Sequence, residues 1–492
     1  MFMAFSTDRR RRGRSVQGIF DTRWVRLTLC GVNEYIVCMT IYSPALSKEK
    51  EPLYMGLADA IERDISAGVL APGTRLPTHR DLADSLGLNV STVTRGYREA
   101  EKRGLVSGTV GRGTFVASDA TTSTSLVSFE PCPAGMLEMG LIEPLDHLDP
   151  SVTEGFKRIS RRKDPSTFMR YSDPRGQLEH RRAGAEWANR FGMEAEAENI
   201  IVSAGSQHAL TCALSGLLRP GERIATDELT YPGLKTLVAM LGLRLVPIRM
   251  DEHGMVPASL DAACRRDEIK AVYLMPGVHN PTTITIPEAR RDELARLADK
   301  HDLIIIEDDA YDLTDPGRLE PVGNRARHRS IYIAGMSKSL AAGLRVAFVV
   351  APASMLKPLA QAVLNTIWMA PPLNVELTSM WINDGTADRV VEQKRAEAAR
   401  RYMLACDLLD GFRFRGKPSG FYLWCELPEP WTGQALENAA REHGVNVFGA
   451  EKFVVGDSPP PRAARISLTG TSTVDQLEKG LRIIRDIVED RP

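Results

Sequence analysis

Apolar positions between residues 52 and 117 predict three short helices followed by a hairpin. In the first helix, Leu57, Ile61 and Ile65 recur every four positions, which places them on one stripe. Thr78 is placed to cap the second helix. The predicted elements are helices over 53–67, 79–87 and 91–103 and two strands within 105–117. Three helices and a Gly-turned hairpin together make a winged helix-turn-helix.

The pattern changes beyond residue 130, where short aliphatic runs alternate with helical stretches. Such alternation indicates a mostly parallel sheet that is covered on both faces. The predicted strands lie within 199–205, 223–228, 243–248, 269–276, 302–309, 330–335 and 345–350. Long helical stretches follow, with strands within 420–428 and 464–470, which indicates a smaller α+β domain. The expected fold class is therefore α/β, with a mostly parallel large domain and a smaller C-terminal domain.

These patterns divide the chain into segments. Residues 52–117 form the predicted winged helix-turn-helix, and the Ser/Thr-rich stretch 118–130 is a linker. The body covers residues 131–492, with a large part at about 175–375 and a small part at about 376–492. Residues 1–51 are expected to be a disordered extension, or to reflect a start assigned too early, with Met39 as the alternative start. The other interpretation is a basic arm that attracts phosphate.

Composition and charge narrow the protein class. The chain is 43% hydrophobic and 25% charged, as in globular proteins with a core, and its formal net charge is -1. Arginine nevertheless gathers in residues 9–14 and 75–112, so a small basic head can lie within a neutral chain. Seven cysteines without a CxxC pair predict neither a metal site nor a disulfide framework, and favour the cytoplasm. No apolar run approaches the ~18 residues that span a bilayer, so no membrane partner is expected.

The predicted third helix and wing carry side chains suited to DNA. Small polar residues at the start of a recognition helix reach bases or phosphates in the major groove, and an arginine one turn later adds a phosphate contact. At the wing tip, glycines permit a tight turn and an arginine there reaches a phosphate or the minor groove. The candidate DNA-binding residues of this helix and wing are Asn89, Ser91, Thr92, Thr94, Arg95, Arg98 and Arg112. The alternative is a winged helix used for protein contacts.

This segment resembles the GntR family of transcription regulators nearly end to end over residues 52–117. The motifs that carry the resemblance are G-x-L-x-P-G-x-x-L-P at 68–77, R-x-L-A at 80–83, S-T-V at 91–93 and G-x-G-T-F-V at 111–116. The resemblance implies that Arg80 clamps a phosphate and that residues 89–95 read bases.

Lys338 in the body is a candidate for covalent chemistry. It follows a predicted strand, and a lysine that attacks a carbonyl group needs a partly desolvated pocket near other cations, which lowers its pKa. Arg345, seven residues later, can supply that cation and bind a cofactor phosphate. On its own, a lysine after a strand is usually just solvated. The surrounding motifs favour pyridoxal 5'-phosphate (PLP) as the cofactor.

Polar residues at the ends of other strands fit the same cofactor. Asp308 ends a buried strand and can keep the pyridine nitrogen protonated, although an isolated Asp pair is by default a loop feature. Tyr311 and Asn280 can donate to the phenolic oxygen, and Tyr231 can stack on the ring. The start of the helix after residue 205 offers backbone N–H groups to a phosphate. Hydroxyl and amide side chains expected around that phosphate are Ser206, Gln207 and Ser337.

The order of these elements resembles the fold-type I, class I/II aminotransferases from about residue 130 to the end. The motifs are Y-x-x-P-x-G at 171–176, N-P-T at 280–282, D-x-A-Y at 308–311, S-K at 337–338 and G-L-R at 343–345. The resemblance implies that Tyr171 reaches a phosphate in the neighbouring subunit and that Arg465 grips a substrate carboxylate. Two positions depart from the family pattern. Gly335 stands where a Ser or Thr is usual, and Thr283 stands where a Gly is usual.

A GntR-type head on an aminotransferase-like body resembles the MocR subgroup of bacterial regulators. The resemblance implies a homodimer that binds DNA, with paired half-sites as the expected operator. It also implies that the body senses a small amino compound by transimination at Lys338, with the effector's carboxylate on Arg465. Two alternatives remain: PLP itself is the effector, or the body is a working aminotransferase with a regulatory DNA-binding head.

Overall fold

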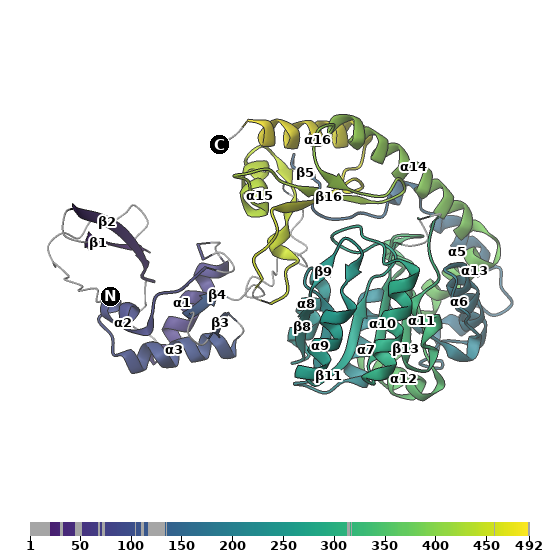
Figure 1. Ribbon diagram of the computed structural model, residues 1–492. Helices are drawn as coiled ribbons and strands as arrows, with labels where there is room; N and C mark the ends of the chain where they lie inside the picture. Colours follow the sequence, from purple (N-terminus) through teal and green to yellow (C-terminus); the bar gives the residue numbers. More distant parts are fainter. Residues whose placement is uncertain are drawn as a thin grey trace. The chain divides into compact units, whose positions relative to one another are not determined.

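The computed structural model describes residues 20–29, 33–44, 52–66, 69–70, 74–103, 105–109, 113–116, 133, 135–311, 315, 317–456 and 458–490. They belong to two compact units, residues 1–124 and 125–492, which are described separately (Figure 1). The division falls within the stretch expected to be a linker, which itself lies outside the described residues. Within the described part of the chain, no helix is long and apolar enough to cross a membrane.

The first unit contains the winged helix-turn-helix. Its elements are α1 (Leu53–Ser66), α2 (His79–Leu86), α3 (Val90–Lys102), β3 (Val106–Thr109) and β4 (Gly113–Val116). The Thr78 side chain accepts a hydrogen bond from the Asp81 amide at the start of α2, and Gly87 ends that helix with φ +66°. The stripe predicted for α1 is buried in one core with residues of α2 and α3, which fixes the three helices against each other.

The structure differs from the expectation for residues 1–51. It contains an antiparallel pair, β1 (Phe20–Leu29) and β2 (Asn33–Tyr42), where the sequence predicted an extension without order. Tyr42 is buried in the core of the helical head, and its hydroxyl donates to Asp64 Oδ2 at 2.7 Å. The aromatic and β-branched residues of 33–42 favour a strand, and this segment has no helical periodicity. The arginine run at 9–14 lies outside the described residues.

A seven-stranded sheet forms the centre of the second unit, in the order β6-β14-β13-β12-β11-β7-β8. Its strands are β6 (Ile200–Ser203), β7 (Arg223–Asp227), β8 (Arg244–Ile248), β11 (Ile269–Leu274), β12 (Ile304–Asp309), β13 (Ser330–Gly335) and β14 (Ala347–Val350). All neighbours are parallel except β14, which is antiparallel to both β13 and β6. The mostly parallel sheet predicted from the sequence is confirmed.

Helices cover both faces of this sheet, as Figure 1 shows. One face packs against α7 (Ser206–Leu217), α8 (Pro232–Met240) and α12 (Ala353–Ile367). The other face packs against α6 (Leu178–Arg190), α9 (Pro257–Arg266), α10 (Glu288–Lys300), α11 (Val322–Arg325) and α13 (Pro372–Asn383). Consecutive strand residues alternate between these cores, since Ile331 and Ile333 belong to the first and Tyr332 and Ala334 to the second.

The small part is an antiparallel sheet, β15-β16-β19-β18, with helices against it. Its elements are β15 (Phe414–Arg415), β16 (Tyr422–Glu426), β18 (Phe448–Gly449), β19 (Ala463–Ser467), α14 (Thr386–Leu408), α15 (Gly433–Glu442) and α16 (Val474–Glu489). The short strand β5 (Leu137–Glu138) pairs with β17 (Val445–Asn446), so this part also recruits chain that precedes the large sheet. Three remaining short elements are α5 (Val152–Ser160), β9 (Met250–Asp251) and β10 (Gly254–Met255).

Candidate functional site

The predicted DNA-reading residues of the head lie at α2 and α3. Arg80, Asn89, Ser91, Arg95 and Arg98 are exposed, and Thr92 is half-buried. Arg112 lies outside the described residues.

Two of these residues also make contacts inside the head. The Thr94 hydroxyl donates to the Val90 carbonyl oxygen at 2.9 Å and lies 3.1 Å from His79 Nδ1. The Arg95 guanidinium lies 4.2 Å from the centre of the Tyr54 ring. Contacts within the head therefore account for the residue type at position 94 and for the position of the Arg95 side chain, and neither requires contact with a DNA base.

In the second unit, a cavity of about 410 Å³ opens where the parallel strands of the large sheet end. The chain leaves β6, β7, β11, β12 and β13 at the same edge, so polar residues far apart in sequence meet there. Ten predicted site residues line this cavity: Ser206, Gln207, Tyr231, Asn280, Asp308, Tyr311, Ser337, Lys338, Arg345 and Arg465. Tyr171 does not line it.

Lys338 follows β13 and points its amine into the cavity wall. Its Nζ donates to the Ile142 carbonyl oxygen at 2.5 Å. Burial is the main reason that the pKa of Lys338 is lowered to about 8; the Glu143 carboxylate opposes this shift, and the cations Arg465, Lys394 and Arg345 contribute to it. A lysine with this pKa carries a sizeable neutral fraction near neutral pH, so the amine is prepared for nucleophilic attack.

Asp308, near the end of β12, is a buried carboxylate, and only one of its two oxygens has a hydrogen-bond partner among the described residues. Its Oδ2 accepts a hydrogen bond from the Tyr273 hydroxyl at 2.8 Å. Its Oδ1 is buried and has no hydrogen-bond partner among the described residues. Burial raises the pKa of Asp308 to about 6, while the Tyr273 hydroxyl opposes that rise. A buried oxygen without a partner is costly, so this geometry suits a ligand that brings a cationic donor to Oδ1.

The opposite end of the cavity is built for an anion. Helix α7 begins at Ser206, and its first backbone N–H groups lack partners within the helix, so its positive end faces the site. Gly205 has φ +88°, and a side chain there would overlap the Arg345 guanidinium. Arg345 itself has φ +49° and donates to Ser337 Oγ at 3.3 Å. A non-glycine residue held in this left-handed conformation is the kind of strain found at functional sites.

The departure at Gly335 has a steric explanation. A Cβ atom at residue 335 would overlap Ser206 Oγ, so the glycine leaves room for that hydroxyl. Both residues line the cavity. The Ser206 hydroxyl from the neighbouring helix start thus occupies the space beside Gly335.

Arg465, on β19 of the small part, is buried and reaches into the same cavity. Its Nη1 donates to Asn280 Oδ1 and its Nη2 to the Gly140 carbonyl oxygen, both at 2.6 Å. Burial lowers the pKa of Arg465, and its Nε has no hydrogen-bond partner in the described chain. The protein therefore holds the guanidinium in place and leaves its Nε–H without an acceptor in the described chain, an arrangement that fits recognition of a carboxylate.

The three tyrosines predicted for the site have different positions. Tyr231 caps α8, and its hydroxyl lies 3.3 Å from Gln207 Oε1. Tyr311 is buried beside Tyr422, with ring centres 5.3 Å apart. Tyr171 is 80% exposed, and its ring packs against that of Trp368, which is 51% exposed. Its predicted contact with a neighbouring subunit is compatible with this exposure and stays a prediction.

Sequence reasoning missed three groups that hold the predicted residues in place. Tyr273 is buried within an aliphatic strand, and a tyrosine in such a run is a signal that its hydroxyl needs a buried partner. The carbonyl oxygens of Ile142 and Gly140 carry no sequence signal, because any residue offers the same acceptor.

The comparisons with known proteins agree with this two-part organisation. Residues 137–484 match the family model of aminotransferase class I and II, and residues 53–116 match that of the bacterial regulatory proteins of the gntR family. The HTH-type transcriptional regulator YdeF of Bacillus subtilis is 37% identical over 451 residues, which cover 91% of this chain and 97% of that protein. The chain belongs to the MocR-type regulators.

Enzymes are more distant relatives of this MocR-type regulator. The 2-aminoadipate transaminase of Thermus thermophilus is 28% identical over 338 residues, covering 66% of this chain and 83% of the enzyme. The solved structure of LysN, an alpha-aminoadipate aminotransferase of Thermus thermophilus complexed with N-(5'-phosphopyridoxyl)-L-leucine, superposes with a TM-score of 0.66. It is 25% identical and covers 76% of this chain and 96% of its own. The regulator is thus a GntR-type DNA-binding domain fused to an aminotransferase-like domain.

Proposed function

We propose that this regulator binds PLP covalently through Lys338 and senses a small amino compound whose carboxylate binds Arg465. The single observation that carries the proposal is the meeting of three groups in one cavity. These are the Lys338 amine with a pKa of about 8, the buried Asp308 carboxylate with one oxygen lacking a hydrogen-bond partner among the described residues, and Arg345 beside the start of α7. PLP supplies a carbonyl carbon that reacts with a neutral primary amine, and a pyridine ring that withdraws electrons when its nitrogen is protonated.

Each group of the chain has a distinct task in this proposal. The Lys338 amine, now held by the Ile142 carbonyl oxygen, would be the group that holds PLP covalently and that an effector amine would displace. Asp308 Oδ1 holds the proton on the pyridine nitrogen, since an ionised buried carboxylate is stabilised by a cationic donor. The N-terminus of α7 and Arg345 bind the phosphate, with Ser206 adding its hydroxyl.

The effector's carboxylate competes for Arg465. It replaces the Asn280 and Gly140 oxygens as acceptors of the guanidinium donors, and a bidentate carboxylate pair is stronger than two neutral hydrogen bonds. Because Arg465 belongs to the small part and Asp308 to the large sheet, a ligand that contacts both biases the separation of the two parts. In a homodimer on paired half-sites in the cytoplasm, this bias changes the spacing of the two heads and hence the affinity for DNA.

The test measures DNA binding of the full-length protein to the DNA upstream of its own gene, by fluorescence anisotropy. The DNA affinity is compared without PLP, with PLP, and with PLP plus each of the common amino acids. A change that requires PLP plus an amine supports the proposal, and a change on PLP alone identifies PLP as the effector. In Lys338→Ala both responses should disappear, whereas the exposed Lys357→Ala should keep them. A Lys338→Ala protein with an unaltered response contradicts the proposal.

A second candidate function is transamination. It is favoured by the presence of all the cavity groups and by the similarity to a transaminase. Multi-turnover assays with amino donors and 2-oxo acids separate the two functions. Sustained turnover at ordinary enzyme rates, above about 1 per second, would contradict a purely regulatory role.

A further inference from the structure

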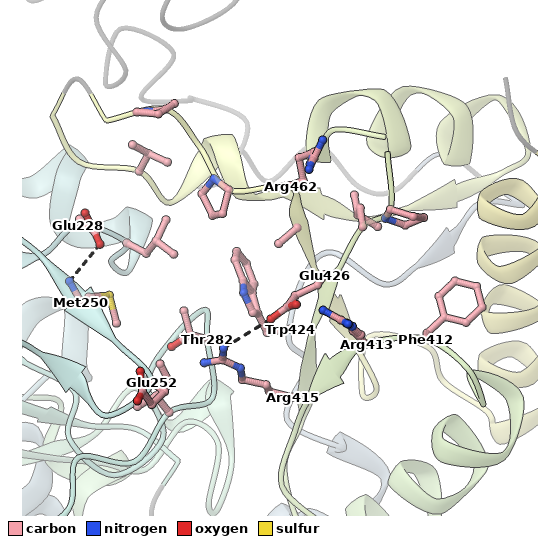
Figure 2. A pocket seen from close by; sticks show the side chains of 18 of the residues that line it. Glu228, Met250, Glu252, Thr282, Phe412, Arg413, Arg415, Trp424, Glu426 and Arg462 are labelled. Atoms are coloured by element: carbon pink, nitrogen blue, oxygen red, sulfur yellow. Dashed lines mark hydrogen bonds and ion pairs between the residues drawn. The ribbon is translucent and has the colours of Figure 1, made fainter. Parts of the chain in front are cut away.

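A second, larger cavity lies between the large and small parts of the body (Figure 2). Its volume is about 1140 Å³, and it shares no described lining residue with the Lys338 cavity. One wall comes from the ends of β7 and β8 and the turn after them, and the other from β15 and β16 of the small part. A molecule that fills this cavity therefore contacts both parts at once.

The two walls differ in charge. Of charged lining residues, the large part contributes only carboxylates, Glu228, Asp251 and Glu252. The small part contributes the arginines Arg413, Arg415 and Arg462 together with the carboxylates Glu426, Glu429 and Glu489. Figure 2 shows the Arg415 side chain reaching toward the side where Glu252 and Thr282 stand.

Not all of these charges are neutralised by the protein. Arg462 pairs with Glu429 at 2.6 Å, whereas Arg415 lies 3.5 Å from Glu426, which is a loose ion pair. Within the described chain, Glu252 and Arg413 have neither an ion pair nor a side-chain hydrogen bond. The cavity thus offers a cation site on one wall and an anion site on the other.

Apolar side chains also line the cavity. They are Trp424, Leu229, Ile284 and Val454, all of which are largely buried. A ligand suited to this arrangement has a positive end, an apolar middle and a negative end. The volume exceeds the upper end of the range for drug-sized ligands, about 300–1,000 Å³, so it holds more than a single amino acid. A short apolar peptide with free termini has all of these properties.

Aromatic packing connects this cavity to Arg465. The Trp424 ring lies 6.2 Å from the Phe453 ring, edge to face, and the Arg465 guanidinium lies 4.9 Å from the centre of the same Phe453 ring. Phe453 lines neither cavity. Its backbone carbonyl also accepts a hydrogen bond from the Thr230 amide of the large part at 2.9 Å. Trp424 and Arg465 are also opposite each other in the β16–β19 pairing, so a shift of Trp424 reaches Arg465 through the strand pairing and through the Phe453 ring.

A strained turn makes a second connection. Thr282 lines the larger cavity, and Asn280, two residues earlier, lines the Lys338 cavity and accepts from Arg465. Thr283, between the lining residues Thr282 and Ile284, adopts φ +61°, a strained conformation for a β-branched residue. This is the position where the aminotransferase pattern has glycine. The strain makes the turn a segment whose conformation a neighbouring ligand can bias.

We propose that the larger cavity is a second ligand site, which binds a short apolar peptide by its two charged termini. The peptide ammonium binds at Glu252 and Glu228, and its carboxylate at Arg415 and Arg413. A bound peptide holds the large and small parts at a fixed separation. The Lys338 cavity is lined by the same two parts, so the peptide lowers the ordering cost of filling that cavity and tightens binding there.

Calorimetry on the full-length protein without PLP tests the site by itself. Trileucine should bind with a stoichiometry of one per chain, and N-acetyl-trileucine amide, which lacks both charges, should bind at least about tenfold more weakly. Arg415→Gln and Glu252→Gln should each weaken trileucine about tenfold, whereas the exposed controls Arg400→Gln and Glu442→Gln should not. Absence of trileucine binding overturns the proposal, and so does binding that ignores both charge substitutions.

The link to the Lys338 cavity rests on the proposed function and needs its own measurement. Saturating trileucine should tighten PLP binding about fivefold, within the usual range of coupling between sites. Phe453→Leu keeps an apolar side chain but loses both ring contacts, so it should retain peptide binding and weaken the effect on PLP. If PLP fails to bind under any condition, the proposed function fails while the peptide site stands. If the peptide binds and the PLP affinity does not change, the coupling is overturned.

Discussion

Replacing Tyr273 with phenylalanine isolates the contribution of one buried hydroxyl to the cofactor cavity. Tyr273 donates to Asp308 Oδ2 at 2.8 Å, and Asp308 Oδ1 has no partner in the described chain. Without the hydroxyl, neither oxygen of the buried carboxylate has a side-chain hydrogen bond within the described part of the chain. The ionised form of Asp308 therefore becomes less stable, and its pKa rises above the value of about 6 that burial already imposes.

The size of the rise follows from the strength of the lost bond. A hydrogen bond to a charged group contributes about 1.5–3 kcal/mol, and one pKa unit corresponds to about 1.4 kcal/mol, so the pKa rises by about one to two units. At pH 7 the ionised fraction of Asp308 then falls from about nine-tenths to between about half and one-tenth. Because PLP is held by the ionised carboxylate, its affinity at pH 7 should fall about two- to tenfold.

The assay is a PLP titration from pH 5 to 9, followed by quenching of tryptophan fluorescence. It is performed in a Lys338→Ala background, so that the titration of the lysine does not contribute to the pH profile. The midpoint at which PLP affinity is lost on acidification should move upward in Tyr273→Phe. The phosphate of PLP titrates in the same range, but it does so equally in every variant.

Tyr332→Phe is the matched control for this experiment. Tyr332 donates to Asp309 Oδ2 at 2.5 Å, so the substitution removes an equivalent buried bond one residue further along β12. Asp309 does not line the cavity. Both variants should lose stability to a similar extent, and only Tyr273→Phe should shift the midpoint. If the two variants have the same midpoint, Asp308 does not control PLP affinity and the assignment of its role is refuted.

Three further predictions follow from other contacts. Asp308→Asn should stabilise the PLP-free protein by up to about 3 kcal/mol at pH 8 and hardly at pH 4. The reason is that the pKa of Asp308 is higher in the folded than in the unfolded protein, so its carboxyl group destabilises the fold only at pH values above the unfolded pKa. Thermal denaturation at the two pH values measures this difference. Gly335→Ser should weaken PLP binding rather than strengthen it, because the new side chain overlaps Ser206 Oγ, and the double variant with Ser206→Ala should recover affinity in the same titration. Arg80→Ala should weaken binding to specific and unrelated DNA alike and reduce the slope of log K against log salt by about 1, as measured by anisotropy; a loss confined to one sequence would assign Arg80 to base reading.

Local signals in the sequence were sufficient for most of the architecture. The Thr78 cap and the Gly87 ending of α2 depend on interactions within a few residues, so the sequence places them correctly. The same holds for the strands of the large sheet, whose buried aliphatic runs are short and bounded by polar residues. The antiparallel direction of β14 is different, because it depends on how the chain returns to the sheet and not on the residues Ala347–Val350.

Contacts between distant segments were beyond local reasoning. Strand β5 pairs with β17 across more than three hundred residues, and nothing in Leu137–Glu138 distinguishes a partner in the small part from one in the large sheet. α13 packs into the core of the large sheet although it lies at the expected boundary between the parts. The carbonyl acceptors of Lys338 and Arg465 are likewise set by the fold. The pattern of side chains identifies which groups a site contains, and topology decides what holds them.

The position of Gly335 changes what can be argued from the departures in the motifs. A glycine in place of the usual Ser or Thr predicts the loss of one phosphate-binding hydroxyl, and that loss would favour a sensor over an enzyme. In the structure, Ser206 Oγ occupies the space that a side chain at 335 would fill, so a hydroxyl is present there without one from residue 335. Gly335 therefore does not discriminate between the two functions. Thr283 remains a departure, but its strain lies in the turn between two cavities and bears on coupling more than on chemistry. The case for a regulator thus rests on the DNA-binding head and on relatives that share both domains, and the cavity by itself is equally suited to either role.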